Sequence, residues 1–75
     1  EVQMMNEELF NIYDNSLNEL PERCRTIFIK VREEKQSYAS VAEELNISPK
    51  TVDAQLQKAV TRLKEKINNY FRNRR

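Results

Sequence analysis

An apolar stripe that keeps the α-helical period for four turns constrains this chain more than any other feature. Its members lie four, three, one, three and four residues apart: Val52, Leu56, Ala59, Val60, Leu63 and Ile67. This spacing places them on one face of a helix. Ser48 and Pro49 stand just ahead, and a Ser N-cap followed by Pro is a typical helix start. The pattern therefore predicts a long helix that begins at Ser48-Pro49 and buries one face.

A shorter helix is predicted directly before the long one. Ser37 is its expected N-cap. Its inner face consists of small and apolar residues: Val41, Ala42 and Leu45. Asn46 suits the left-handed conformation that ends a helix, and Ile47 is expected to be buried beneath the turn. Two helices that meet through a tight turn and share an apolar seam form a helix-turn-helix, here over residues 37–67.

Two supporting helices are predicted upstream. The first covers residues 1–17, with a possible break at residues 14–16, and its apolar positions are Val2, Met5, Leu9, Ile12, Tyr13 and Leu17. The second covers residues 21–34, with Pro21 as its first helical residue. Its apolar face holds Cys24, Ile27, Phe28 and Val31. Residues 68–75 are expected to form a basic tail, in which Tyr70 and Phe71 extend the helix and the last residues are disordered.

The composition agrees with an all-α domain. A chain of 75 residues holds one small domain, here residues 1–75, and the absence of Gly disfavours turn-rich β-structure. We expect a bundle of about four helices with no β-sheet. A single Cys and no His exclude an internal disulfide and a metal site, and they leave no plausible catalytic constellation. Cys24 is expected to be a small buried residue rather than a reactive thiol.

Charge is divided unevenly along the chain. Residues 1–45 contain five Lys or Arg and ten Asp or Glu, a balance of −5. Residues 46–75 contain eight basic and two acidic residues, a balance of +6, and the two halves sum to the net charge of +1. The basic half coincides with the long helix. Such a basic region favours phosphate binding, whereas a merely solvated surface would have its acids spread more evenly.

The residues opposite the apolar stripe are short, polar or basic: Lys50, Ala54, Gln57, Lys58 and Thr61. In the major groove, Gln57 favours adenine, Lys58 favours guanine, and the methyl group of Ala54 can touch thymine. Residues at the start of the long helix suit phosphate: Ser48, Lys50 and Thr51. Arg62 and Tyr38 are expected to contact backbone on either side. The pattern predicts a DNA-reading surface.

Asp53 does not fit this surface of donors. We expect it in the first turn of the long helix, where a carboxylate favours the helix dipole but repels phosphate. It could accept a hydrogen bond from a cytosine amino group. The interpretation that we favour is an orienting role, in which Asp53 holds a neighbouring Lys or Gln.

Three segments closely resemble region 4 of the sigma-70 family of bacterial sigma factors. These are LNELPERCRTIF, SYASVAEELNIS and PKTVDAQLQKAVTRLKEKI, residues 17–28, 37–48 and 49–67. The subtype that they resemble most is the extracytoplasmic-function group of Bacteroides-like bacteria. The resemblance implies a four-helix, winged-helix-like domain whose last helix reads the promoter −35 element. By position it assigns base reading to Asp53, Ala54, Gln57 and Lys58, and backbone contacts to the helix start at Ser48, Lys50 and Thr51.

The resemblance also implies partners. These are promoter DNA, the β-subunit flap of RNA polymerase and an anti-sigma factor, in the cytoplasm, with no membrane, cofactor or small-molecule substrate. Region 2 of the family, which recognises the −10 element, is not in residues 1–75, so we expect an excised domain.

The chain departs from the family in its connections. Lys35-Gln36 and Asn46 stand where Gly is frequent, and Ser40 replaces a common Glu, which removes a capping box with Ser37. None of these positions is on the reading face. Two other functions stay open. One is the DNA-binding domain of a LuxR-type response regulator, which shares the turn IS-KTV. The other is a helical protein-interaction module that never touches DNA.

Overall fold

Four α-helices account for most of the residues that the computed structural model describes, 7–72. They are α1 (Glu7–Glu19), α2 (Glu22–Phe28), α3 (Tyr38–Leu45) and α4 (Pro49–Arg72). One turn of π-helix, Ile29–Glu33, continues α2. There is no strand within residues 7–72. The prediction of an all-α fold with about four helices and a helix-turn-helix is confirmed.

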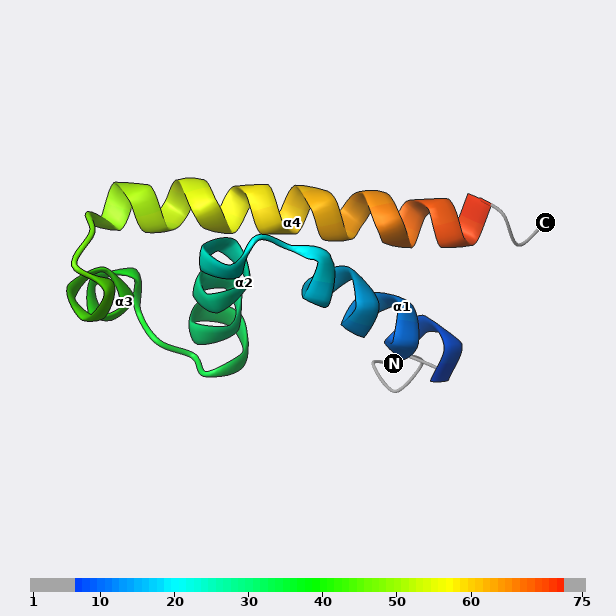
Figure 1. The fold of residues 1–75 in the computed structure, drawn as a ribbon, viewed down its shortest axis with the longest axis horizontal. Helices are drawn as coiled ribbons and strands as arrows, with labels where there is room; N and C mark the ends of the chain where they lie inside the picture. The colour runs from blue at the N-terminus through cyan, green and yellow to red at the C-terminus, as the bar shows by residue number, and fades with distance from the viewer. Residues whose placement is uncertain (1–6, 73–75) are drawn as a thin grey trace.

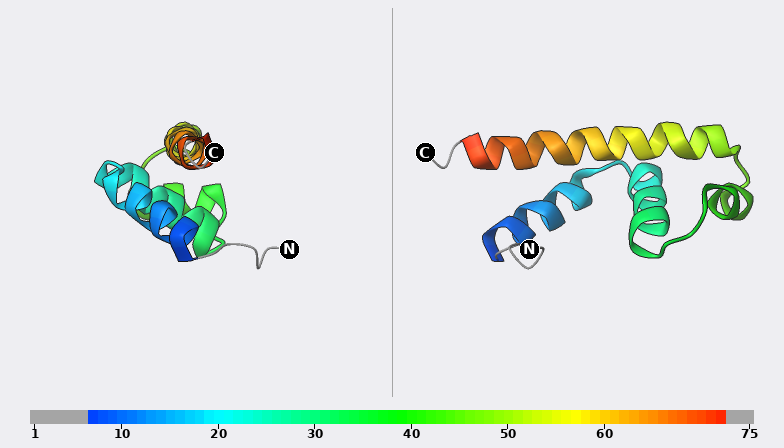
Figure 2. Two further views of the ribbon diagram at one scale, coloured as in Figure 1. Left: turned by 90° about the vertical axis from the view of Figure 1, so that its right-hand side faces the viewer. Right: turned by 180° about the vertical axis from the view of Figure 1, so that it is seen from behind.

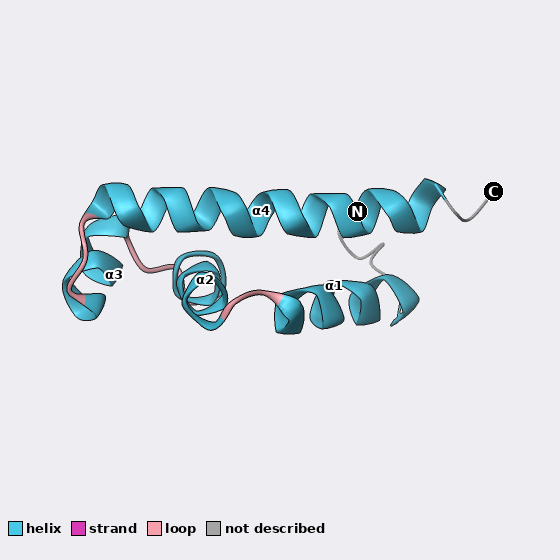
Figure 3. Cartoon of the chain, turned by 45° about the horizontal axis from the view of Figure 1, so that its top comes forward, coloured by secondary structure: helices cyan, strands magenta, loops and turns pink. Residues whose placement is uncertain are grey.

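The long helix α4 determines the shape of the molecule. Its 24 residues extend over about 36 Å at the usual helical rise, in a molecule that measures 44 × 21 × 16 Å. The other three helices follow one another along one side of α4 (Figure 1). The view along α4 in Figure 2 shows all three on that same side. In Figure 3, α2 is seen almost end-on, so its axis crosses that of α4. No element within residues 7–72 therefore covers the opposite side of α4.

The hydrophobic core lies between α4 and the three shorter helices. Its largest fully buried side chains are Ile27 of α2, Val41 of α3, and Val52 and Leu56 of α4. The predicted stripe on α4 is buried at Val52, Leu56, Ala59 and Leu63, and partly buried at Val60 and Ile67. Leu20, in the link between α1 and α2, is also buried and was missing from the predicted apolar faces.

The predicted end of the first helix is wrong. We expected an end at residue 17 and a possible break at residues 14–16, but α1 continues without interruption to Glu19. The hydroxyl of Ser16 donates to the carbonyl oxygen of Ile12 at 2.7 Å, so this polar side chain is satisfied inside the helix and is buried against the core. Val2 and Met5, which we placed on the same helix, lie outside the described residues.

The second helix also differs from its prediction. Pro21 is the N-cap residue, with φ −55° and ψ 148°, and not the first helical residue. The helix does not run regularly to residue 34. Its last turn widens into the π-form, in which the Glu34 N–H donates to Ile29 five residues back at 2.9 Å. Lys35 then adopts a left-handed φ of 59°.

The helix-turn-helix has the predicted caps. The Ser37 hydroxyl accepts from the Ser40 N–H at 3.0 Å, so half of the capping box persists although Ser40 replaces Glu. Asn46 ends α3 in the left-handed conformation, with φ 59° and ψ 47°. Ile47 packs against the core but is only partly buried, less than we expected. The Ser48 hydroxyl accepts from the Thr51 N–H at 3.0 Å, and α4 begins at Pro49.

The predicted extension of the long helix through Tyr70 and Phe71 into the basic tail is confirmed. Helix α4 runs through Tyr70 and Phe71 to Arg72, so residues 68–72 are helical. The three residues that we expected to be disordered, 73–75, lie outside the described residues. No helix within residues 7–72 combines the length and the apolar character that a membrane span needs.

The left-handed conformation of Lys35 predicts a stabilising substitution. The left-handed conformation costs a residue with a side chain about 1–2 kcal/mol of stability, whereas Gly adopts it without this cost. We expect Lys35→Gly to raise the free energy of unfolding by about 1 kcal/mol in urea denaturation, because the greater freedom of Gly in the unfolded chain offsets only part of the relieved strain. Lys35→Ala is the control: it removes the same charge and keeps the strain. Equal stability of the two variants would contradict a backbone origin.

Candidate nucleic-acid interface

The side of α4 that faces away from the core carries the predicted reading residues. All four predicted base readers are exposed: Asp53, Ala54, Gln57 and Lys58. Lys50, Thr61 and Arg62 are exposed on the same helix. Since α1, α2 and α3 all pack on the opposite side (Figure 1), no described element covers this surface. We call it the α4 outer face.

The middle of the α4 outer face is slightly hollowed. The depression has a volume of about 310 Å³. Residues three or four positions apart along the helix line it: Ala54, Gln57, Lys58, Thr61, Arg62 and Glu65. The short side chains of Ala54 and Thr61 alternate with longer ones. A surface of this kind allows the helix backbone to approach base edges closely, while amide and ammonium groups remain at hand to donate.

The start of α4 offers donors to an anion. Pro49 has no N–H, and the N–H groups of Thr51 and Val52 donate to the Ser48 hydroxyl and carbonyl oxygens at 3.0 and 3.1 Å. The Lys50 N–H is then the first-turn donor that no group within residues 7–72 engages. The Ser48 and Thr51 hydroxyls lie 3.0 Å apart and share one hydrogen bond, which leaves one hydroxyl proton for an outside acceptor. The Ser48 cap therefore leaves donors at the start of α4 that an anion could accept from.

Tyr38 is separate from this group. It lies on the first turn of α3, and its exposed fraction is 37%. It does not line the hollow of the α4 outer face, nor a second hollow on the flank of α4. The structure brings together the predicted residues of α4 but not this tyrosine.

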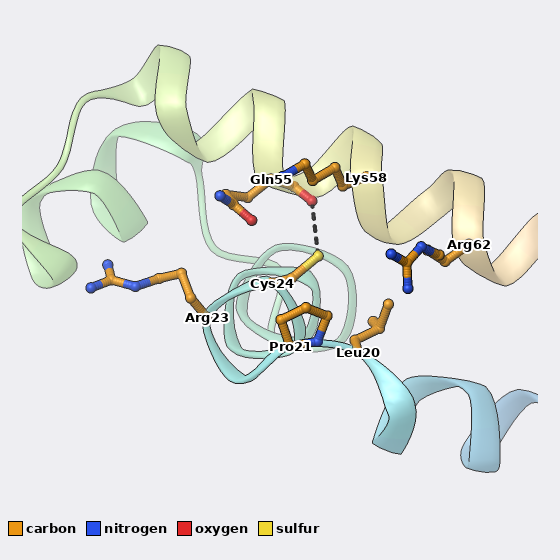
Figure 4. Close-up of a pocket in the computed structure, with 7 residues that line it drawn as sticks. All are labelled: Leu20, Pro21, Arg23, Cys24, Gln55, Lys58 and Arg62. Atoms are coloured by element: carbon orange, nitrogen blue, oxygen red, sulfur yellow. Dashed lines mark hydrogen bonds between the residues drawn. The ribbon is translucent and has the colours of Figure 1, made fainter.

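A second hollow, of about 280 Å³, lies where the link between α1 and α2 meets the flank of α4 (Figure 4). Its lining residues come from the link, from α2 and from α4: Leu20, Pro21, Arg23, Cys24, Gln55, Lys58 and Arg62. Figure 4 shows Arg23 on one side of Cys24 and Arg62 on the other. Three cations, Arg23, Lys58 and Arg62, thus surround one concave surface that adjoins the α4 outer face.

Arg23 and Gln55 were not predicted to belong to a site. Gln55 could have been found from the helical period, because it flanks the apolar stripe next to Leu56. No local signal could have found Arg23, since only the packing of α2 brings it to α4. Arg25, two residues later, is engaged elsewhere, because its guanidinium donates to the carbonyl oxygen of Asn18 at 3.2 Å.

Cys24 closes the base of this hollow and is only 2% exposed, as expected for a small buried residue. Its thiol donates to the carbonyl oxygen of Gln55 at 3.3 Å and so ties α2 to α4. Burial raises the pKa of the Cys24 thiol, and the positive charges of Lys58 and Arg62 oppose this effect. The thiol is therefore held in its protonated, unreactive form near neutral pH.

The ion pairs of the described residues leave the α4 outer face unpaired. Lys30 bonds Glu44 at 2.8 Å, and Lys66 bonds Glu19 at 3.0 Å. The first pair joins the π-turn after α2 to α3, and the second joins α4 to α1. Lys50, Lys58 and Arg62 take part in no ion pair within residues 7–72, so their charges are available to a phosphate.

Asp53 is placed differently from its prediction. The first turn of α4 contains no acid, because Asp53 is the fifth residue of the helix and belongs to its second turn. The dipole effect falls off within the first turn. Within residues 7–72, no hydrogen bond or ion pair joins Asp53 to Lys50 or Gln57, so the structure does not support the orienting role either.

The environment of Cys24 predicts slow alkylation. We expect the native chain to react with iodoacetamide at pH 8 much more slowly than the chain in urea, because the thiol is buried and its pKa is raised. Mass spectrometry of timed samples measures both rates. Equal rates in the two states would show that the thiol is accessible.

The comparison with protein families finds one match. A family model described as Sigma-70, region 4 matches residues 10–63, which is 54 of the 75 residues. The match includes α2, α3 and the first 15 residues of α4, and with them all of the predicted site residues. Neither the curated proteins nor the solved structures that were searched gave a significant match. The chain belongs to the sigma-70 region 4 family.

Proposed function

We propose that this domain binds the promoter −35 element in a sequence-specific manner, as part of a sigma factor that directs bacterial RNA polymerase. The observation that carries this proposal is the α4 outer face. It is exposed and rich in donors, and its cations take part in no ion pair among the described residues. Membership of the family supports the assignment of this face to DNA. The match also favours this family over the LuxR-type domain.

In the proposed complex, the first half of α4 enters the major groove, as the second helix of a helix-turn-helix does. Gln57 and Lys58 then meet base edges, and the methyl group of Ala54 lies where a thymine methyl would fit. These three residues are exposed on consecutive turns. Thr61 is one turn beyond Gln57 and Lys58 and marks the far end of the contact.

Phosphates are proposed on both sides of that contact. One side is the start of α4, where the hydroxyl pair of Ser48 and Thr51 has one proton to donate and Lys50 presents its ammonium and its backbone N–H. The other is the hollow beside α2, whose lining residues include Arg23 and Arg62. Charged groups of this kind fix the register of a protein on DNA without reading its sequence. Tyr38 remains a proposed backbone contact on α3.

We also propose the subtype and the protein partners that the resemblance implies. The subtype is the extracytoplasmic-function group. The partners are the β-subunit flap of the polymerase and an anti-sigma factor. Phe10 on α1 and Phe71 near the end of α4 are 51% and 57% exposed, and neither lines the hollows on α4. Exposed aromatic side chains of this size favour protein contacts. They are also the observation that keeps a pure protein-interaction module as a second candidate.

Lys58 supplies the most direct test of base reading. We expect Lys58→Ala to weaken binding to a −35-type duplex by roughly 1–3 kcal/mol, because a donor to guanine is lost. Fluorescence anisotropy with the 75-residue chain measures the affinity. Lys35→Ala is the matched control, since it removes the same charge from the connection between α2 and α3, on the side away from the α4 outer face (Figure 1). Equal affinities of the two variants would remove Lys58 from the reading set.

The salt dependence of binding tests the proposed phosphate contacts. If Arg23, Lys50 and Arg62 each neutralise one phosphate, the slope of log K against log salt concentration is about −2.7. We expect Arg23→Ala to reduce the magnitude of the slope by about 0.9. A flat salt response of the unaltered chain would favour the protein-interaction module, and an unchanged slope in Arg23→Ala would exclude Arg23 as a phosphate contact.

A further inference from the structure

Asp53 is the acidic residue nearest the start of α4, and its place on the exposed face needs an explanation. It lies on the second turn, one turn after Pro49 and Lys50 and one turn before Gln57. Its side chain is exposed, and it takes part in no hydrogen bond or ion pair within residues 7–72. A negative charge here opposes the attraction of DNA phosphates by Lys50, Lys58 and Arg62. On electrostatic grounds alone it weakens binding.

Three structural explanations for this carboxylate fail. It lies beyond the first turn, where an acid would stabilise the helix dipole. It also holds neither Lys50 nor Gln57 in place. A contribution to the core is excluded by its exposure. What remains is the chemistry of the carboxylate itself, which accepts hydrogen bonds and cannot donate them.

In the major groove, this chemistry distinguishes the bases. Cytosine presents only an amino donor there, and adenine presents a donor beside an acceptor. Guanine and thymine present acceptors, which repel a carboxylate. We propose that Asp53 makes the interface selective for cytosine, by accepting from the cytosine amino group and penalising guanine and thymine at that position. This inference rests on the proposed function and names the base that one position of the site requires.

The arrangement of Asp53 and Lys58 supports a division of roles. At 3.6 residues per turn, the two side chains are separated by about 140° around α4. Ala54 and Gln57 lie between them on the α4 outer face. The Lys58 ammonium only donates hydrogen bonds, and the ionised Asp53 carboxylate only accepts them. Lys58 therefore requires an acceptor on the base that it meets, and Asp53 requires a donor on the base that it meets. A helix with donors alone would bind any sequence rich in acceptors, and Asp53 removes that ambiguity.

Asp53 therefore lowers affinity in general while raising selectivity. Replacement by Asn keeps the shape, removes the charge and adds a donor, so it should relieve the repulsion of phosphates and admit other bases. We expect Asp53→Asn to bind an unrelated duplex more tightly than the unaltered chain. At the position that Asp53 reads, the preference for cytosine should fall by about 5- to 150-fold, the range of a specific base contact.

The test is selection of bound duplexes from a pool randomised over eight base pairs, using the 75-residue chain and its variants. Anisotropy titrations with single duplexes that carry each of the four base pairs at the selected position follow. Asp53→Asn and Asp53→Ala are compared with Asp14→Asn, which removes the same charge from an exposed position on α1, away from the α4 outer face. Circular dichroism confirms that each variant is helical, and two substitutions at an exposed position guard against a folding defect in one.

The outcomes are distinguishable. The inference predicts that the unaltered chain and Asp14→Asn share a cytosine preference that both Asp53 variants lose. If both Asp53 variants select the same motif as the unaltered chain, or if Asp14→Asn loses the preference equally, the inference is overturned and the proposed function stands. A loss of preference for guanine or thymine alone would also overturn it. If the unaltered chain neither binds nor enriches any duplex, the proposed function itself fails.

Discussion

The burial of one face of α4 is the constraint on which the rest of the structure depends. Val52, Leu56, Ala59 and Leu63 form a seam against which α1, α2 and α3 all pack. A domain of this size buries only about 60% of its unfolded surface, so few other contacts are available to hold it together. Because all three helices use the same side of α4, the other side is fixed in orientation and left exposed. The packing of the core on one side of α4 therefore also determines which residues the other side presents.

The connections position these helices without glycine. Asn46 adopts the left-handed conformation between α3 and α4, and Lys35 does so after the π-turn of α2. Tyr13 of α1 donates to the Glu33 carboxylate on that turn at 3.1 Å and packs its ring on Phe28, which ties α1 to the end of α2. Burial and the bond to Glu33 raise the pKa of Tyr13 to about 12. Contacts on the far side of the domain from the α4 outer face therefore fix how α2 meets α4.

Local signals predicted much of this fold. The period of the stripe, the Ser caps at both helices of the helix-turn-helix and the left-handed Asn46 each depend on a few neighbouring residues, and the structure has them all. Tertiary contacts decided the rest. Ser16 stays in α1 because its hydroxyl bonds Ile12, and α2 ends in a π-turn that no sequence pattern indicated. The predicted residues of α4 share one face, whereas Arg23 joins them through packing alone.

The central claim is that DNA bases meet the α4 outer face and that DNA phosphates meet the residues flanking it. A nitrogen-15 NMR titration of the 75-residue chain with a −35-type duplex tests it most directly, since each backbone N–H reports on its own surroundings. The account predicts that the largest shifts fall on Lys50, Ala54, Gln57, Lys58 and Thr61, with Arg23 shifting at the edge. Shifts centred on Phe10 and Phe71 with an unchanged α4 outer face would contradict it.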